Sequence, residues 1–106
     1  MSKGKRKEDR KYKRLDVRYG SEEPHHRCVA VQLSTRGAFL QAARPMYKAG
    51  SRIVVEIASP DKTYVINAVV RHIRNIPPQM AGSIRPGMGV EFLSPPPELQ
   101  DFLDSL

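Results

Sequence analysis

Residues 52–73 read RIVVEIASPDKTYVINAVVRHI, and this stretch predicts an antiparallel β-hairpin. The segments 52–58 and 63–73 are rich in isoleucine and valine, which favour strands. The four residues between them, SPDK, form a turn cluster of the kind that joins two neighbouring strands. The hairpin therefore predicts that the domain is built on an antiparallel sheet.

Four further segments have strand character, because they alternate apolar with polar residues or are rich in β-branched side chains. These segments are residues 15–19, 28–33, 38–42 and 87–93. In the second of them we expect Val29, Val31 and Leu33 to face the core. Gln32 then lies on the opposite face. Cys28 is the single cysteine of the chain, so it cannot form an internal disulfide and is expected to be a buried, unreactive thiol.

The last segment, SPPPELQDFLDSL at 94–106, predicts a short helix. Its apolar residues recur at helical spacing, at positions 99, 102, 103 and 106. The prolines before it and the acidic Glu98 and Asp101 suit a helix N-terminus. We expect this helix to cover one end of the core, and docking of a partner is the alternative role.

Six short strands and one terminal helix predict an all-β fold, a six-stranded antiparallel β-barrel with a short C-terminal helix. A parallel α/β fold would need helical crossovers between the strands, and the sequence contains none. The 106 residues fit one domain. We expect residues 1–9 to be a disordered basic leader and residues 10–106 to form the barrel domain with its N-terminal arm.

Positive charge is concentrated at the N-terminus. Residues 1–18 hold nine Lys/Arg against three Asp/Glu, a net charge of +6, whereas the other 88 residues hold nine against eight, a net charge of +1. This distribution indicates an anionic partner, such as a phosphate ligand, nucleic acid or an acidic protein surface, and a solvated tail is the alternative. No long apolar run or secretory signal is present, so we expect a cytoplasmic protein without membrane association.

Enzyme and metal signatures are scarce. The sequence has no Walker loop, GxSxG or HExxH, and its carboxylates form no paired motif. His25 and His26 are adjacent and His72 stands alone, so no set of ligands occurs at metal spacing. We therefore expect no enzyme activity, no catalytic residue, no metal and no cofactor.

The basic stretch RKYKR at 10–14 can bind an anion. A guanidinium group forks two hydrogen bonds onto phosphate oxygens or onto the O6/N7 edge of guanine, and it stacks on purines. In an extended chain Arg10 and Arg14 would lie on the same side, about 13 Å apart. An arm that carries both could therefore grip the phosphates and bases of a guanine nucleotide.

The turn QLSTRG at 32–37 supplies complementary groups. Ser34 can donate a hydroxyl hydrogen bond, Gln32 offers an amide, and Arg36 adds a charge. Gly37 permits a close approach of the backbone.

On these residues the sequence resembles the PilZ domains, bacterial receptors for the second messenger cyclic di-GMP. Their signature is RxxxR in an N-terminal arm, followed by [D/N]xSxxG in a strand and turn. RKYKR matches the first half, and QLSTRG matches the second half except at Gln32, where the family has Asp or Asn. The segments GAFLQA, AGSRIVVEI, NAVVRHI and MGVEFL and the terminal helix are similar to the remaining elements of the family, so the resemblance covers residues 10–106.

The resemblance implies a ligand, cyclic di-GMP, and a role for each site residue. Arg10 and Arg14 would clamp phosphates and guanines, Ser34 and Gly37 would seat the ligand on the barrel, Gln32 would meet a guanine edge, and Arg36 would add a contact. Binding would order the leader and change the surface shown to a downstream protein partner.

The RxxxR spacing repeats at Arg6, Arg10, Arg14 and Arg18. Arg10 and Arg14 are favoured because the second arginine of the family directly precedes the first apolar strand residue, which is Leu15 here.

Two other functions stay open at this point. Gln32 and the terminal helix are also compatible with a degenerate PilZ-like interaction module that binds no nucleotide. The basic leader could bind nucleic acid generally, which predicts an affinity that falls steeply with salt. This second alternative is less favoured, since only Tyr12 and Tyr19 accompany the leader as stacking side chains.

Overall fold

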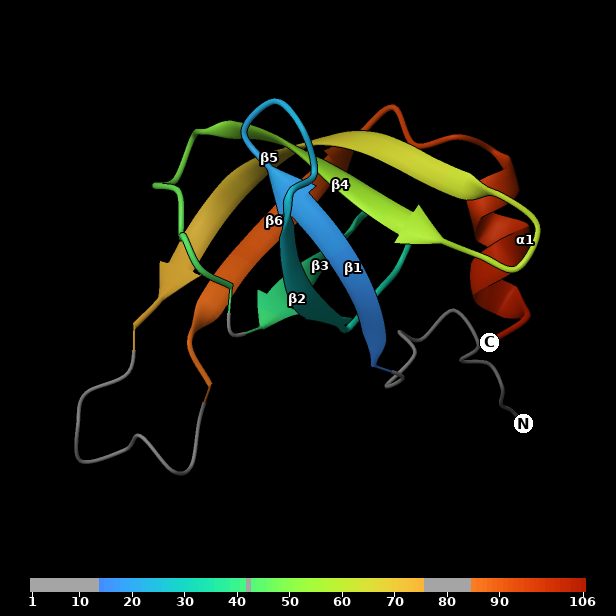
Figure 1. Ribbon diagram of the computed structural model, residues 1–106, viewed down its shortest axis with the longest axis horizontal. Coiled ribbons are helices and arrows are strands. Elements are labelled where there is room, and N and C mark those ends of the chain that lie inside the picture. The colour runs from blue at the N-terminus through green and yellow to red at the C-terminus, as the bar shows by residue number, and fades with distance from the viewer. Residues whose placement is uncertain (1–13, 42, 76–84) are drawn as a thin grey trace, which may run out of the picture.

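The structure, a computed structural model, describes residues 14–41, 43–75 and 85–106. These residues form a closed antiparallel barrel of six strands with one helix (Figure 1), which confirms the predicted fold class. The elements are β1 (Leu15–Gly20), β2 (His26–Val31), β3 (Gly37–Gln41), β4 (Arg52–Ala58), β5 (Thr63–Arg74), β6 (Gly87–Leu93) and α1 (Glu98–Asp104). The expected leader, residues 1–9, lies outside the described residues, and the domain limits stay a prediction.

The strands follow the order β1-β2-β3-β6-β5-β4 around the barrel. The predicted hairpin is β4–β5, whose pairing runs from Arg52 opposite Val69 to Ala58 opposite Thr63. The backbone N–H of Ser59 donates to the carbonyl of Lys62 at 2.8 Å and closes its turn. Pairing of β1 with β4 closes the barrel.

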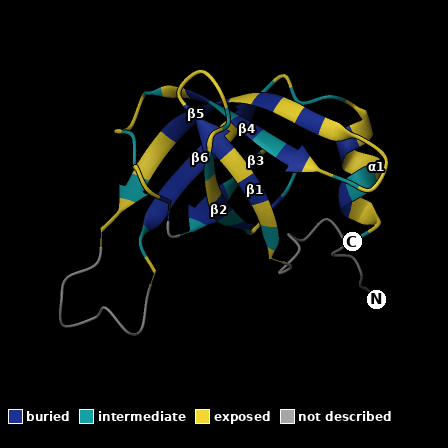
Figure 2. Ribbon diagram, in the orientation of Figure 1, coloured by how far each residue is buried: buried dark blue, intermediate teal, exposed yellow. Residues whose placement is uncertain are grey.

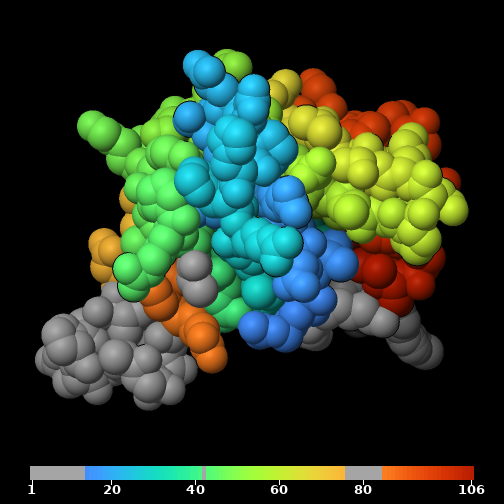
Figure 3. Space-filling view, viewed as in Figure 1, coloured from blue at the N-terminus to red at the C-terminus, as the bar shows by residue number. Residues whose placement is uncertain are grey.

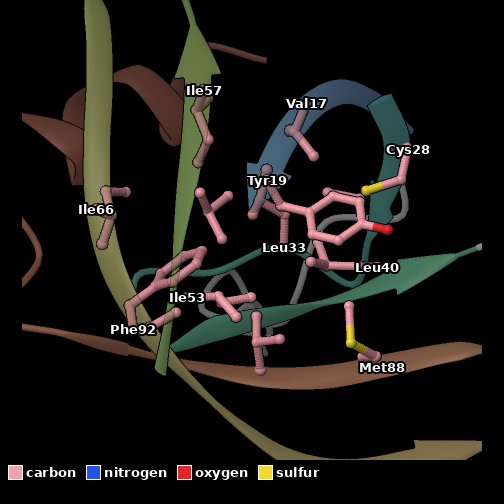
Figure 4. Packing of buried hydrophobic residues seen from close by; sticks show 14 of the residues in the cluster. Val17, Tyr19, Cys28, Leu33, Leu40, Ile53, Ile57, Ile66, Met88 and Phe92 are labelled. Atoms are coloured by element: carbon pink, nitrogen blue, oxygen red, sulfur yellow. The ribbon is translucent and has the colours of Figure 1, made fainter. Parts of the chain in front are cut away.

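Alternating residues of each strand fill the barrel, as the buried and exposed bands along β1 and β5 show (Figure 2). The core includes Tyr19, Cys28, Leu33 and Leu40, and Met88 lies beside Leu40 (Figure 4). Full burial of one such aliphatic side chain stabilises the fold by about 2 kcal/mol. The buried phenol of Tyr19 donates a hydrogen bond of 2.6 Å to the carbonyl of Pro45, so its polar tip is satisfied.

Helix α1 covers one end of the barrel, near the β4–β5 turn (Figure 1). Leu99 and Leu103 are buried in the core, and the ring of Phe102 stacks on Tyr64 with 5.8 Å between centroids. The helical spacing of the sequence therefore predicted the correct apolar face, and this face packs on the core of the barrel.

The predicted inward face of β2 was wrong. Cys28 and Ala30 are buried, whereas Val29 and Val31 are only half-buried on the outer face. The cause is Gln32, whose φ of 52° breaks the extended chain, so that Leu33 turns inward after it. The alternation of inward and outward side chains therefore does not continue from Val31 to Leu33.

Cys28 is buried, as predicted. Burial, and secondarily the charge of Asp16, raises the pKa of its thiol to about 12. Because the thiolate is the reactive form, Cys28 is inert near neutral pH.

Candidate functional site

The start of β1 and the turn between β2 and β3 lie at the same end of the barrel (Figure 1). Leu15 pairs with Ala30, so the preceding residue, Arg14, lies level with Val31, the last residue of β2. Arg14 is exposed. The antiparallel register thus brings Arg14 beside the turn that follows β2, while Arg10 lies outside the described residues.

Backbone hydrogen bonds fix the shape of this turn. The N–H of Ser34 donates to the carbonyl of Gly37 at 2.9 Å, and the N–H of Arg36 donates to Ser34 Oγ at 3.1 Å. The carbonyl of Arg36 accepts a hydrogen bond of 2.8 Å from the N–H of Phe92, a residue of β6. Backbone hydrogen bonds therefore tie the turn to the barrel.

Two polar side chains of the turn are available to an anion. Ser34 Oγ accepts from the Arg36 N–H, and within the described residues its own proton is not donated to any acceptor. A hydroxyl donates one hydrogen bond, so Ser34 can donate it to a phosphate oxygen. The side chain of Arg36 is exposed and provides a guanidinium group on this turn.

Gly37 is required by packing within the barrel. A β-carbon at this position would lie 2.1 Å from the carbonyl oxygen of Val90 in β6. Gly37 pairs with Glu91, so it begins the β3–β6 ladder. The sequence predicted a close backbone approach here, and the backbone that approaches is that of β6. A contact of Gly37 with a ligand stays a prediction.

Gln32 is exposed and has left-handed backbone geometry, with φ of 52°. Asn and Asp adopt this region far more readily than other side chains, because their short polar groups bond locally to the backbone. The PilZ signature has Asp or Asn at this position. The left-handed backbone is therefore a conformational reason for that preference, separate from any ligand contact.

Gln32→Asn is expected to raise the free energy of unfolding by about 0.5 kcal/mol, because asparagine relieves part of the left-handed strain. Urea denaturation of the purified chain measures the change. Gln32→Ala keeps the unfavourable backbone and should give no gain. An asparagine variant no more stable than the alanine variant would contradict this explanation.

Arg18, which continues the RxxxR spacing, lies elsewhere. It faces Arg27 across β1–β2 and Glu56 across β1–β4, about 13 Å along the strand from Arg14. Figure 3 shows the face on which β1 and β2 lie beside β4. An open depression of about 350 Å³ lies between these three strands. It is lined by Asp16, Val17, Arg18, Arg27, Cys28, Glu56 and Ala58. Because Arg18 lies away from the turn at 32–37, the structure favours Arg14 over Arg18 as the second arginine of the motif.

Among the described residues, no three His, Cys, Asp or Glu side chains gather where they could hold a metal ion. His25 Nε2 lies 3.2 Å from Glu23 Oε1, and the ring of His26 packs on Tyr19 with 5.4 Å between centroids. A second open depression, of about 320 Å³, lies at the β1–β2 loop and is lined by Ser21, Glu22, Glu23, His25, His26 and Tyr47. No helix in the described part of the chain is long and apolar enough to cross a membrane.

The geometry agrees with a comparison against protein families, in which the model of the PilZ domain matches residues 4–106. The chain belongs to the PilZ family. PilZ domains are regulatory receptors for cyclic di-GMP and not enzymes. The matched range includes both Arg14 and the turn at 32–37, although which residues contact a ligand stays a prediction.

Among solved structures, the PilZ chain is similar to the Bacillus subtilis inhibitor of motility (MotI/DgrA), with a TM-score of 0.69 and 22% sequence identity. The alignment covers 95% of this chain and 49% of the other, so the chain spans about half the length of that protein. This likeness shows that the two share the barrel fold. A comparison with curated proteins gave no match.

Proposed function

We propose that this PilZ domain is a receptor for cyclic di-GMP, bound at the end of the barrel where β1 begins and β2 ends. The observation that carries the proposal is the β1–β2 register, which places Arg14 level with the end of β2 and beside the turn at 32–37. Membership of the PilZ family supports the choice of ligand. Arg10, four residues before Arg14, would complete the arginine pair from the arm.

Each group has a distinct task in this proposal. Arg14 forks onto a phosphate or stacks on a guanine, since guanidinium groups do both. Ser34 donates its hydroxyl proton to a phosphate oxygen, and Arg36 adds positive charge at the rim. The amide of Gln32 carries both donors and an acceptor, which suits the mixed edge of guanine.

The output of such a receptor is a change of surface. Closure of the arginine arm on the ligand would alter what the barrel end presents to a protein partner in the cytoplasm. The structure of similar fold belongs to an inhibitor of motility. We propose a regulatory role for this chain, namely control of a partner protein by binding, without a reaction catalysed by the chain.

Calorimetric titration of the whole chain with cyclic di-GMP tests the proposal, with cyclic di-AMP as the matched nucleotide. The two share the phosphate ring, but adenine lacks the O6 acceptor of guanine. We expect a Kd of about 1 μM or tighter for cyclic di-GMP and binding of cyclic di-AMP at least about tenfold weaker. Absence of binding heat with cyclic di-GMP would refute the receptor function. Equal affinities for the two nucleotides would refute specific hydrogen bonding to the guanine edge.

A further inference from the structure

A β-bulge on β5 collects basic side chains on the outside of the barrel. The register of β5 on β6 shifts between Val70 and His72. Successive residues of a regular strand point to opposite faces, but the extra residue of a bulge re-aims those that follow. As a result Arg71, His72 and Arg74 are all exposed, while Val70 is buried and Ile73 packs against the core.

Arg74 is held in place within this group. Its guanidinium carbon lies 4.3 Å from the centroid of the Phe39 ring. Its Nε and Nη2 atoms donate hydrogen bonds of 3.1 and 2.8 Å to the carbonyl oxygen of Arg85. A guanidinium group has five N–H donors, and three of those of Arg74 make no hydrogen bond within the described residues. Little side-chain freedom is left to lose when a partner binds.

Two glycines of β6 form the floor under the neighbouring rings. A β-carbon at Gly89 would lie 2.0 Å from the ring of His72, and one at Gly87 would lie 2.7 Å from the ring of Phe39. The two rings are nearly parallel, at 24°, with 6.3 Å between centroids. The missing side chains let both rings lie close to the β6 backbone, with Phe39 buried beneath Arg74 and His72 exposed.

The same surface reaches the turn at 32–37. Arg71 Nε donates a hydrogen bond of 2.6 Å to Glu91 Oε1, and Glu91 is paired with Gly37, the last residue of that turn. The outer face of β5 and β6 is thus continuous with the proposed nucleotide site. A partner seated on it would also touch the region that nucleotide binding changes.

We propose that the β5 basic face, defined as Arg71, His72, Arg74 and Arg85, is a docking surface for an acidic segment of a protein partner. Its three arginines against the adjoining Glu91 give a net charge of +2, before any charge on His72. Arginine is one of the residues enriched in interface hot spots. A nucleic acid fits less well, because sequence-independent binding of a polyanion depends on many Lys/Arg–phosphate contacts, whereas this face offers only its three arginines.

The test is an NMR titration of the ¹⁵N-labelled full chain, without nucleotide, with a short synthetic peptide that alternates glutamate and tyrosine. We expect amide shifts at residues 71–74 and 87–91. The same peptide with glutamine for every glutamate should cause none of them. Arg74→Gln is expected to weaken binding of the acidic peptide by about fivefold, as loss of one exposed but pre-organised charge contact allows.

Arg27→Gln is the matched control, since Arg27 is an exposed arginine of β2 outside the β5 basic face. It should leave the affinity unchanged within about twofold. Equal losses in the two variants, shifts confined to the leader, or equal shifts with the glutamine peptide would overturn the proposal. Tighter binding of a uridine oligonucleotide at the same amides would overturn it in favour of a nucleic-acid surface. Because no nucleotide is present, the outcome is independent of cyclic di-GMP binding.

Discussion

Gly37→Ala is expected to lower the free energy of unfolding by about 3 kcal/mol, or to prevent folding. The added β-carbon would lie 2.1 Å from the carbonyl oxygen of Val90 and 3.1 Å from its carbonyl carbon. Overpacking costs about 1–3 kcal/mol where side chains can adjust. Here the obstacle is the backbone of β6, which cannot move without loosening its ladder with β3, so the cost lies at the upper end. Urea denaturation followed by circular dichroism measures it.

Gly50→Ala provides the matched control. Gly50 has a positive φ of 94°, but no atom lies within 4 Å of the position that its β-carbon would take. Its alanine variant meets backbone strain alone, which costs about 1 kcal/mol. Equal losses in the two variants would show that strain, and not the clash with Val90, explains the effect. The comparison also bears on binding studies, because a nucleotide-binding defect in Gly37→Ala could reflect a damaged barrel.

The sequence predicted the fold well where one regular pattern covered a whole element. The hairpin at 52–73 has two strands rich in Ile and Val around a short turn, the C-terminal helix has regular apolar spacing, and both were confirmed. The prediction failed on the inward face of β2, because the left-handed Gln32 lies between Val31 and Leu33 and reverses the alternation. The order of apolar and polar residues in the sequence does not reveal a change in one backbone angle.

The candidate site was predictable in part, because its residues belong to recognisable sequence motifs. The motif supplied Arg14 and the turn at 32–37, and an antiparallel β1–β2 hairpin then brings them to one end. The β5 basic face was not predicted. Arg71 and His72 are adjacent in sequence and would point to opposite faces of a regular strand. Only the bulge after Val70 places both outside, and its position depends on how β5 pairs with β6.

Arg14→Ala is expected to weaken cyclic di-GMP binding by about 100-fold. A guanidinium group that forks onto a phosphate makes charge-assisted hydrogen bonds, and their loss costs about 2.7 kcal/mol, which is a hundredfold in Kd. Arg14→Lys keeps the charge but not the fork, so its affinity should lie between those of the alanine variant and the wild type. Calorimetry on the whole chain, at one salt concentration for all variants, gives the three values.

Arg18→Ala decides the register of the arginine series. Arg18 lies on β1 between Arg27 and Glu56, about 13 Å along the strand from Arg14 and from the end of β2. Its removal changes the net charge as much as removal of Arg14 does, but it should leave affinity within about twofold of the wild type. A large loss of affinity in Arg18→Ala with a small loss in Arg14→Ala would indicate that the nucleotide binds at the depression between β1 and β4. Similar, modest losses of affinity in both variants would mean that the basic N-terminal region attracts the nucleotide by charge alone. A specific contact with one arginine would instead make the two variants differ.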